Sequence, residues 1–172
     1  METFLIDRMA TPQGELLLIA DEENRLRAID WSDHYERLMK LLHNHYGANA
    51  FTLMEKRNPG GLSDSMQRYF AGELNIIDNL PVKTAGTDFQ RQVWDQLRKI
   101  PCGETITYGE LAKRINRPTA SRAVGMANGL NPISIVVPCH RVIGQQGALT
   151  GYAGGVERKR WLLIHEGYLL AR

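Results

Sequence analysis

The amino-acid sequence predicts an α+β protein, a mixed α/β chain built in two parts. Short apolar and β-branched runs separated by turn signals occupy the first third of the 172 residues, a pattern typical of strands. From Thr87 onward the apolar residues recur at helical spacing. The stretch from Leu80 to Gly86 contains a proline and ends on glycine, which favours a linker. We therefore expect one domain at residues 1–82 and a second at residues 83–172.

The first part is expected to begin with a small antiparallel meander, because Pro12-Gln13-Gly14 is a turn signal between two apolar runs. A polar helix, a short apolar run and an amphipathic helix follow. Ser63, which comes after Asn58-Pro59-Gly60-Gly61, is expected to cap the amphipathic helix. The expected strands are Phe4 to Met9, Glu15 to Ala20 and Leu26 to Trp31, the helices His34 to Tyr46 and Ser63 to Phe70, and the short run Phe51 to Met54.

The second part is expected to hold a helix-turn-helix, because two short helices flank a tight turn. Thr87 and Thr107 are predicted helix caps, and Pro101-Cys102-Gly103 ends the first helix. The first helix is expected to bury Phe89, Val93, Leu97 and Ile100, with Trp94 beside them. The second helix is expected from Tyr108 to Ile115 and the third from Ala120 to Gly129, with Asn116-Arg117-Pro118 as the turn between them.

The third helix is unusual because its residues are small and Arg122 is its only long polar side chain. A helix this thin fits the close approach of another backbone, such as the minor groove of DNA, and it also fits tight helix packing inside the protein. The small residues are Ala120, Ser121, Ala123, Gly125, Ala127 and Gly129.

Cys139 and His140 are the candidate nucleophile and base. Asn131-Pro132 ends the third helix, and Ile133 to Val137 is predicted to be a short buried strand that leads to Pro138-Cys139-His140. A thiol reacts as the thiolate, and histidine titrates in the range needed to take its proton. Neighbouring residues of a strand point to opposite faces, so contact requires a turn or a bridging water. An isolated Cys-His pair also fits a cysteine that is merely a small buried hydrophobe.

Glu166 is the candidate partner that orients the base. It lies in the last turn of a helix expected from Val156 to Gly167, where the helix dipole disfavours a carboxylate. Such a violation of a local rule can mark a functional site. A solvated surface glutamate is the alternative interpretation.

Composition narrows the class of protein. Residues 1–82 hold 8 basic and 13 acidic side chains, whereas residues 83–172 hold 13 and 6, so the second part suits an anionic polymer, although ordinary surface variation fits as well.

No apolar run approaches the roughly 20 residues that span a bilayer, and we expect a cytoplasmic protein. The two cysteines are too few for a disulfide framework, and His43 and His45, two apart on a helix, do not suit zinc. No metal is expected.

Three sequence blocks together resemble the methylated-DNA–protein-cysteine methyltransferases, the O6-alkylguanine-DNA alkyltransferases, of the Ogt type. The blocks are Arg122-Ala-Val-Gly, Asn131-Pro-Ile and Pro138-Cys-His-Arg-Val. The likeness covers essentially the whole chain and includes Phe89-Gln90 to Trp94 and the block Trp161 to Gly167. The resemblance implies a small ribonuclease-H-like N-terminal domain with an antiparallel sheet. It also implies a helical C-terminal domain that holds the helix-turn-helix and the reactive cysteine.

The resemblance implies a role for each catalytic residue. Cys139 accepts the alkyl group, His140 acts as the base through a water, and Glu166 holds the imidazole. Asn131 ties the turn between the recognition helix and the active-site segment. Tyr108 donates its hydroxyl proton to the guanine as negative charge accumulates there.

The resemblance also implies a DNA surface and a base pocket. Arg122 enters the base stack in place of the flipped nucleotide, and Ser121, Ala123 and Ala127 lie along the minor groove. Tyr152 lines the pocket, where the backbone near Cys139, Val142, Ala153 and Gly154 contacts the guanine. Some relatives carry serine in place of Ala153, and others bind a zinc for which this chain lacks the cysteines.

The implied function is DNA repair by direct reversal, in which one alkyl group passes irreversibly from O6-alkylguanine, with O4-alkylthymine as a further substrate, to Cys139. Duplex DNA with the lesion is the expected partner, no cofactor or membrane is involved, and the protein is expected to be a monomer. Two other hypotheses use the same residues. A thiol hydrolase would turn over with Cys139, His140 and Glu166, and a helix-turn-helix regulator would be indifferent to the loss of Cys139.

Overall fold

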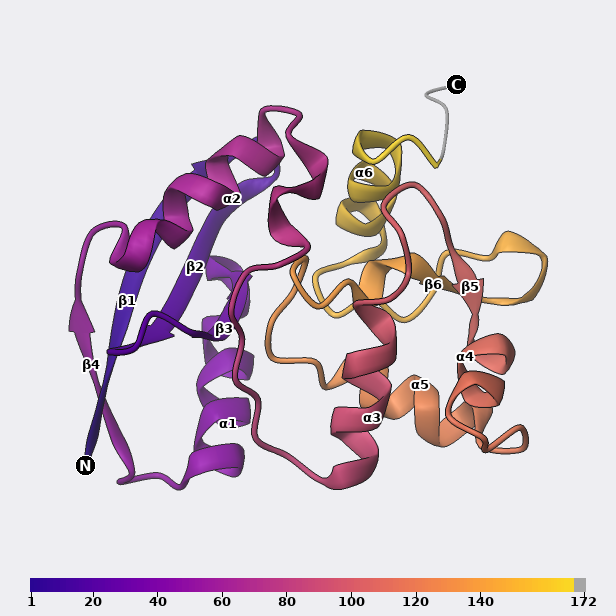
Figure 1. Cartoon of the computed structure of the whole chain (residues 1–172), viewed down its shortest axis with the longest axis horizontal. Helices are drawn as coiled ribbons and strands as arrows, with labels where there is room; N and C mark the ends of the chain where they lie inside the picture. Colours follow the sequence, from indigo (N-terminus) through magenta and orange to yellow (C-terminus); the bar gives the residue numbers. More distant parts are fainter. Residues whose placement is uncertain (169–172) are drawn as a thin grey trace. The chain divides into compact units, whose positions relative to one another are not determined.

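The computed structural model describes residues 1–168, and the chain divides into two compact units, Met1–Ala85 and Gly86–Arg172 (Figure 1). The first unit is a four-stranded sheet with two helices, and the second consists mainly of helices with a two-stranded sheet. The predicted α+β class is confirmed.

The sheet of the first unit begins as the predicted meander. β1 (Glu2–Thr11) pairs antiparallel with β2 (Gly14–Asp21), which pairs antiparallel with β3 (Leu26–Trp31). The turn between β1 and β2 lies at Pro12-Gln13, as predicted. Gly14, which follows it, has a φ of 114°, a value that glycine tolerates best.

The fourth strand differs from the prediction of an antiparallel sheet, because β4 (Phe51–Glu55) pairs parallel with β1 and makes the sheet mixed. The strand order is β3-β2-β1-β4. From β3 at one edge, the chain passes through α1 (Tyr35–Tyr46) and returns at the opposite edge. Parallel strands need a long crossover of this kind, and a helix commonly supplies it.

The core of the first unit lies between α1 and the sheet. Residues at alternate positions of β1 and β2 point to the same face and meet one face of the helix. The packed residues are Phe4, Ile6, Leu17, Ile19, Ala28, Leu38, Leu42 and Phe51. Six successive residues of β2 are buried, so both faces of the sheet are covered.

The predicted cap of the amphipathic helix is wrong. Ser63 does not cap α2 (Leu62–Phe70), because Gly61 is the N-cap and the Ser63 hydroxyl instead donates to the Asp7 carboxylate at 2.6 Å. The segment expected to be the linker also contacts the sheet, since the backbone of Pro81 and Lys83 hydrogen-bonds to Leu26 at its edge. Backbone groups at an open strand edge need partners, and this segment supplies them.

The second unit contains the predicted helix-turn-helix. The helices are α3 (Asp88–Leu97), α4 (Tyr108–Arg114), α5 (Ser121–Gly129) and α6 (Val156–His165), and β5 (Ile106–Thr107) pairs parallel with β6 (Val142–Ile143). Thr87 forms a capping box with Gln90, and Thr107 accepts from the backbone of Glu110 at 3.1 Å, as expected of both caps. Helices α3, α4 and α5 pack against one another.

Candidate active site around Cys139

The segment before the cysteine is a turn, not the predicted strand. The backbone N–H of Val137 donates to Ile133 at 3.0 Å, and Ile135 has a φ of 73°. A fully buried apolar run gives no periodicity that separates a strand from a packed turn, which is why the prediction failed.

The side chain of Asn131 holds this turn. Its amide nitrogen donates to the carbonyl of Val137 at 2.7 Å and to that of Ile133 at 3.4 Å, and its oxygen accepts from the backbone N–H of Ile133 at 2.9 Å. Asn131 is buried, so these contacts replace lost contacts with water. The structure thus puts Asn131 between α5 and the cysteine segment.

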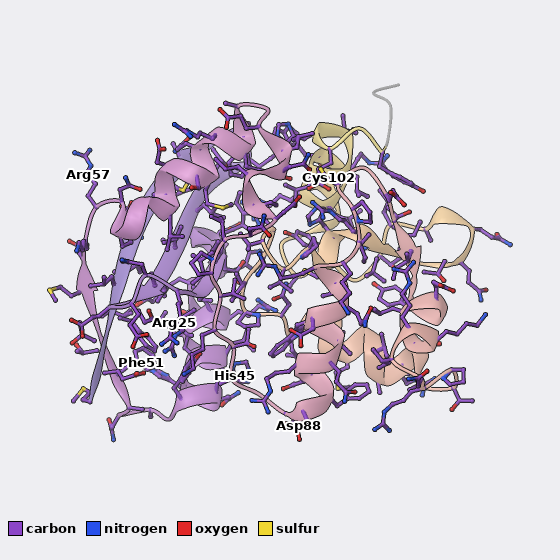
Figure 2. All side chains as sticks on the ribbon, in the orientation of Figure 1. Arg25, His45, Phe51, Arg57, Asp88 and Cys102 are labelled. Atoms are coloured by element: carbon purple, nitrogen blue, oxygen red, sulfur yellow. The ribbon has the colours of Figure 1, made fainter. Side chains whose placement is uncertain are left out.

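Cys139 lies at the start of a 3₁₀ turn, Cys139–Arg141, which also carries His140. The cysteine is 6% exposed and the histidine 0%. The 3₁₀ turn is the local break that a Cys-His contact was expected to require. Neither Cys139 nor the half-buried Cys102 in the loop after α3 (Figure 2) forms a disulfide.

His140 and Glu166 are in contact inside the second unit. The imidazole Nε2 lies 2.8 Å from Oε2 of Glu166, and the carboxylate is 5% exposed as a residue. Burial lowers the pKa of His140 despite the adjacent carboxylate, so the imidazole is neutral at pH 7. With Nε2–H directed at Glu166, the Nδ1 lone pair is the acceptor. None of residues 1–168 offers Nδ1 a hydrogen bond.

Arg141 completes the charge balance and was not predicted as a site residue. Its Nε donates to Glu166 Oε1 at 2.8 Å, a terminal nitrogen donates to Oε2 at 3.0 Å, and the other donates to the carbonyl of Ile100 at 2.8 Å. Burial by itself raises the pKa of Glu166, but His140 and Arg141 outweigh it and hold that pKa well below its usual range. Glu166 is therefore ionised, and the solvated surface role is excluded.

Lys159 is a second residue that the sequence prediction missed. Its ammonium donates to the carbonyls of Val142 and Thr150 at 2.5 and 2.8 Å, and the residue is 1% exposed. Burial lowers the pKa of Lys159 to about 8, while negative charge on Cys139 acts to raise it. The signal was available, because Lys159 and Glu166 share the buried stripe of the last helix with Leu162 and Leu163.

Tyr108 begins α4, and its hydroxyl donates to the carbonyl of Thr150 at 3.2 Å. Burial raises the pKa of Tyr108, and negative charge on Cys139 raises it further, which places the hydroxyl in the electrostatic field of the thiol. Tyr152, from the same loop as Thr150, is buried and packs edge-on to the imidazole of His140 at 6.5 Å between ring centroids.

The other expected pocket residues lie in β6 and in the loop that precedes α6. Val142 follows the Cys139 turn directly as part of β6, and its carbonyl accepts a hydrogen bond from the Lys159 ammonium. Ala153 is partly exposed and Gly154 is buried. The ring contact between Tyr152 and His140 places the loop that contains Ala153 and Gly154 next to the Cys139 turn.

The two sides of α5 differ. Ser121, Arg122 and Ala123 are exposed, whereas Ala127 is 3% exposed and its carbonyl accepts from the indole of Trp94 at 2.9 Å. The expected DNA contact through the Ala127 side chain therefore does not fit this surface. The small residues of α5 therefore fit both tight packing inside the protein and the approach of a DNA backbone, since one side of the helix is buried and the other is exposed to solvent.

Among residues 1–168, no group of three or more histidine, cysteine or acidic side chains is placed to hold a metal ion. The imidazole of His43 stacks on Phe51 at 5.5 Å between ring centroids. Within the same residues, no helix is long and apolar enough to cross a membrane.

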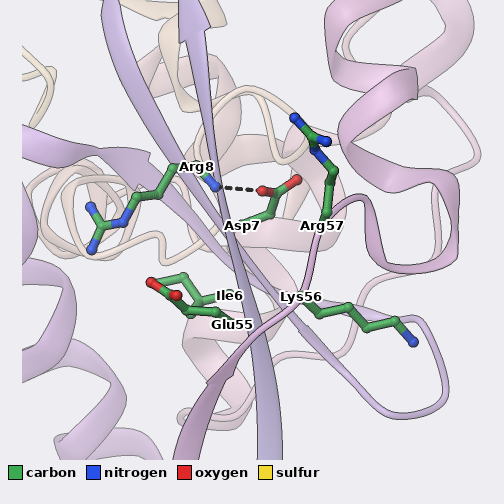
Figure 3. Close-up of a pocket in the computed structure, with 6 residues that line it drawn as sticks. All are labelled: Ile6, Asp7, Arg8, Glu55, Lys56 and Arg57. Carbon is green, nitrogen blue, oxygen red and sulfur yellow. Dashed lines mark hydrogen bonds between the residues drawn. The ribbon is translucent and has the colours of Figure 1, made fainter.

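A separate cavity of about 350 Å³ lies on the first unit, where Ile6, Asp7 and Arg8 face the end of β4 (Figure 3). Arg57 projects outward beside it (Figure 2). Burial alone raises the pKa of Asp7, but hydrogen bonds from Ser63 and from backbone N–H groups lower it overall. Asp7 is thus a structural carboxylate that anchors the start of α2, and the residues that line this cavity include neither a cysteine nor a hydroxyl side chain.

The chain is similar to one family in both units. Residues 88–168 match the 6-O-methylguanine DNA methyltransferase, DNA binding domain, and residues 6–84 match the ribonuclease-like domain of the same proteins. A methylated-DNA–protein-cysteine methyltransferase of Shigella flexneri is 58% identical over 99% of both chains, and one of Salmonella typhimurium is 57% identical over the same shares.

Solved structures agree. An O6-methylguanine methyltransferase of Mycobacterium tuberculosis superposes with a TM-score of 0.76 at 38% identity, covering 95% of this chain and 93% of the other. The same organism's OGT in complex with DNA gives a TM-score of 0.75 at 40% identity, covering 96% and 92%. The implied two-domain architecture, with a ribonuclease-like first domain, is confirmed.

Proposed function

The chain belongs to the methylated-DNA–protein-cysteine methyltransferase family, and on this premise we propose that it repairs O6-alkylguanine in duplex DNA by moving the alkyl group irreversibly to its own Cys139. The contact between His140 and Glu166 beside the cysteine carries the proposal, because a neutral imidazole with a free Nδ1 lone pair is the base that a thiol nucleophile needs.

Each residue has one task in the transfer. His140 takes the thiol proton through a water, and Glu166 with Arg141 keeps the imidazole in the tautomer that accepts at Nδ1. The thiolate of Cys139 attacks the alkyl carbon, so that an S–C bond forms while the C–O bond breaks. The electron pair of that bond goes to the guanine, which is neutralised by a proton from the Tyr108 hydroxyl. A thioether remains, and the molecule acts once.

DNA is held by the exposed side of α5 in this proposal. Arg122 fills the base stack after the nucleotide rotates out, because a buried thiol cannot reach a base inside the duplex. Ser121 and Ala123 beside it allow the minor groove to approach, and exposed cations before the helix contact phosphates without sequence preference. These cations are Lys113, Arg114 and Arg117.

The flipped guanine would lie against Tyr152, with backbone groups of Val142, Ala153 and Gly154 around it. A partly exposed Ala153 keeps its backbone N–H for such a contact even though it has no hydroxyl. The reaction needs no cofactor, and a single copy of the chain suffices. A reactive thiol is preserved in a reducing compartment, which favours the cytoplasm.

The experiment is to incubate the protein with duplex DNA that contains O6-methylguanine and to map its peptides by mass spectrometry. We expect one methyl group on Cys139 per repaired lesion, none on Cys102, and full activity of the control variant Cys102→Ser. Cys139→Ser should bind the DNA and transfer nothing. An unmodified Cys139, or product released over many turnovers as a thiol hydrolase would release it, would overturn the proposal.

A further inference from the structure

The hydroxyl of the partly buried Tyr108 lies against the loop that contains Thr150 and Gly151. It donates to the carbonyl of Thr150 at 3.2 Å, and a Cβ on Gly151 would come within 2.8 Å of it. The ring lies against α5, where a Cβ on Gly125 would be 3.7 Å from the ring edge. A methyl group at Gly125 would make an ordinary van der Waals contact with the Tyr108 ring, so the ring lies beside α5 while the hydroxyl is held by the loop at residues 150–151.

Asn128 of α5 interacts both with the backbone of Cys139 and with this hydroxyl. The residue is 2% exposed, and its amide nitrogen lies 3.4 Å from the carbonyl oxygen of Cys139, to which it donates. The same side chain interacts with the Tyr108 hydroxyl in a way that lowers the pKa of Tyr108. An amide nitrogen carries two N–H groups, so one amide can serve both neighbours. Its oxygen Oδ1 is buried and has no hydrogen-bond partner within residues 1–168.

We propose that Asn128 is a positioning residue that holds the Tyr108 hydroxyl in line with the guanine. One N–H of the Asn128 amide donates to the hydroxyl oxygen of Tyr108, and the other donates to the carbonyl of Cys139. The proposal rests on the function proposed above and adds a residue to it. Buried polar side chains are normally held by hydrogen bonds, and a link between the proton donor and the nucleophile explains why Asn128 is polar at this buried position of α5.

The chemistry explains why a donor is needed at that oxygen. When Tyr108 gives its proton to the guanine, the phenol becomes a tyrosinate beside Cys139. Burial opposes that anion, because burial raises the pKa of Tyr108, whereas the negative charge on Cys139 is lost as the S–C bond forms. An N–H from Asn128 stabilises the anion more than the neutral phenol, as hydrogen bonds to charged groups are the stronger ones. Tyr108 afterwards regains a proton from solvent, and His140 releases to solvent the one taken from the thiol.

The test compares two methyl donors with different leaving groups. The guanine of O6-methylguanine must be protonated as it leaves, whereas iodide from iodomethane needs no proton. In Asn128→Leu, which keeps the side-chain size and removes the amide, we expect transfer from O6-methylguanine DNA to be about tenfold slower. Methylation of Cys139 by iodomethane should change less than about twofold, because no proton donor takes part.

Two further variants complete the test. In a Tyr108→Phe background, Asn128→Leu should have no additional effect, since the hydroxyl that it positions is gone. Asn44→Leu, on the exposed side of α1, is the matched control and should leave both rates unchanged. If Asn128→Leu fails to fold by circular dichroism, Asn128→Ser replaces it with the same expectations.

Equal slowing with both donors would assign Asn128 a purely structural role in the Cys139 turn and overturn the proposal. Unchanged transfer from DNA, or fully additive effects with Tyr108→Phe, would overturn it as well. In each of these cases the wild-type protein still methylates Cys139, so the function proposed above stands. Only a wild-type protein that leaves Cys139 unmodified contradicts that function.

Discussion

The imidazole of His140 and the carboxylate of Glu166 lie 2.8 Å apart, although the two residues are 26 positions apart in the chain. The 3₁₀ turn and the end of α6 meet at this pair, and Arg141 neutralises the carboxylate from its other side. The base, its orienting acid and the balancing cation thus form one buried unit.

Glu166→Gln should slow alkyl transfer by about a hundredfold or more. The carboxamide presents an N–H where the carboxylate accepted, so it cannot hold both the imidazole and the guanidinium, and the base loses its fixed tautomer. The stopped-flow or quench rate of Cys139 methylation by O6-methylguanine DNA measures the effect. Glu157→Gln, exposed on the same helix, is the control that should retain the wild-type rate. A wild-type rate in Glu166→Gln would refute the orienting role.

Glu166→Gln should also destabilise the fold by about 3 kcal/mol, because it leaves the buried guanidinium of Arg141 without its counter-charge. Urea unfolding followed by circular dichroism measures this loss. A stability equal to that of wild type would mean that Arg141 finds other partners.

Lys159 should make stability depend on pH in a defined direction. Its pKa is about 8 in the folded protein and near the ordinary 10.5 in the unfolded chain, so the cost of burying the charge is fully present below about pH 8. The cost shrinks as pH rises, because the folded protein releases this proton first. Relative to Lys159→Met, the free energy of unfolding of the wild type should rise by about 2 kcal/mol between about pH 8 and about pH 10. Parallel curves for the two proteins would contradict the depressed pKa.

Asn131→Ala should cost about 2 to 3 kcal/mol of stability, because it removes the hydrogen bonds to Ile133 and Val137 and leaves their backbone groups buried. Urea unfolding measures it. Asn131→Asp should be at least as harmful, since a carboxylate keeps the acceptor for Ile133 and faces the Val137 carbonyl with negative charge. If the aspartate variant were as stable as wild type, the amide donors would not hold this turn.

Arg122→Ala should leave folding intact, because the side chain is exposed, and should slow repair in duplex DNA. Methylation by free O6-methylguanine base should stay at the wild-type rate, since no stack has to be filled. Arg160→Ala, an exposed cation on α6, controls for the general loss of charge. Equal duplex rates for Arg122→Ala and wild type would refute the stack-filling role.

Local patterns predicted most of the fold. The caps at Thr87 and Thr107, the turn at residues 116–118 and the meander follow from short-range chemistry, and each is present. The direction of β4 did not follow from the sequence, because pairing direction depends on where the crossover through α1 returns the chain. Ser63 failed as a cap because its hydroxyl found Asp7, a partner 56 positions away.

The site residues that belong to a recognisable sequence motif could be predicted from the sequence. Cys139, His140 and Glu166 came from the motif and the family resemblance, and the structure brings His140 and Glu166 together. Arg141, Lys159 and Asn128 are polar residues whose burial depends on tertiary packing, and only Lys159 left a signal, as a charge on an apolar stripe. Ala127 was expected at the DNA surface because a pattern of small residues does not say which side of a helix is covered.

Arg141 also bears on how the second unit comes apart. One guanidinium ties the exit of α3 at Ile100 to the Cys139 turn and, through Glu166, to the last helix. Local unfolding of the Cys139 turn therefore requires the guanidinium to lose its three hydrogen bonds to Ile100 and Glu166 together, which raises the free energy of such an opening. The amide hydrogens of this turn should consequently be among the slowest in the protein to exchange with deuterium. The same rigidity should slow the oxidation of the Cys139 thiol by small oxidants in solution.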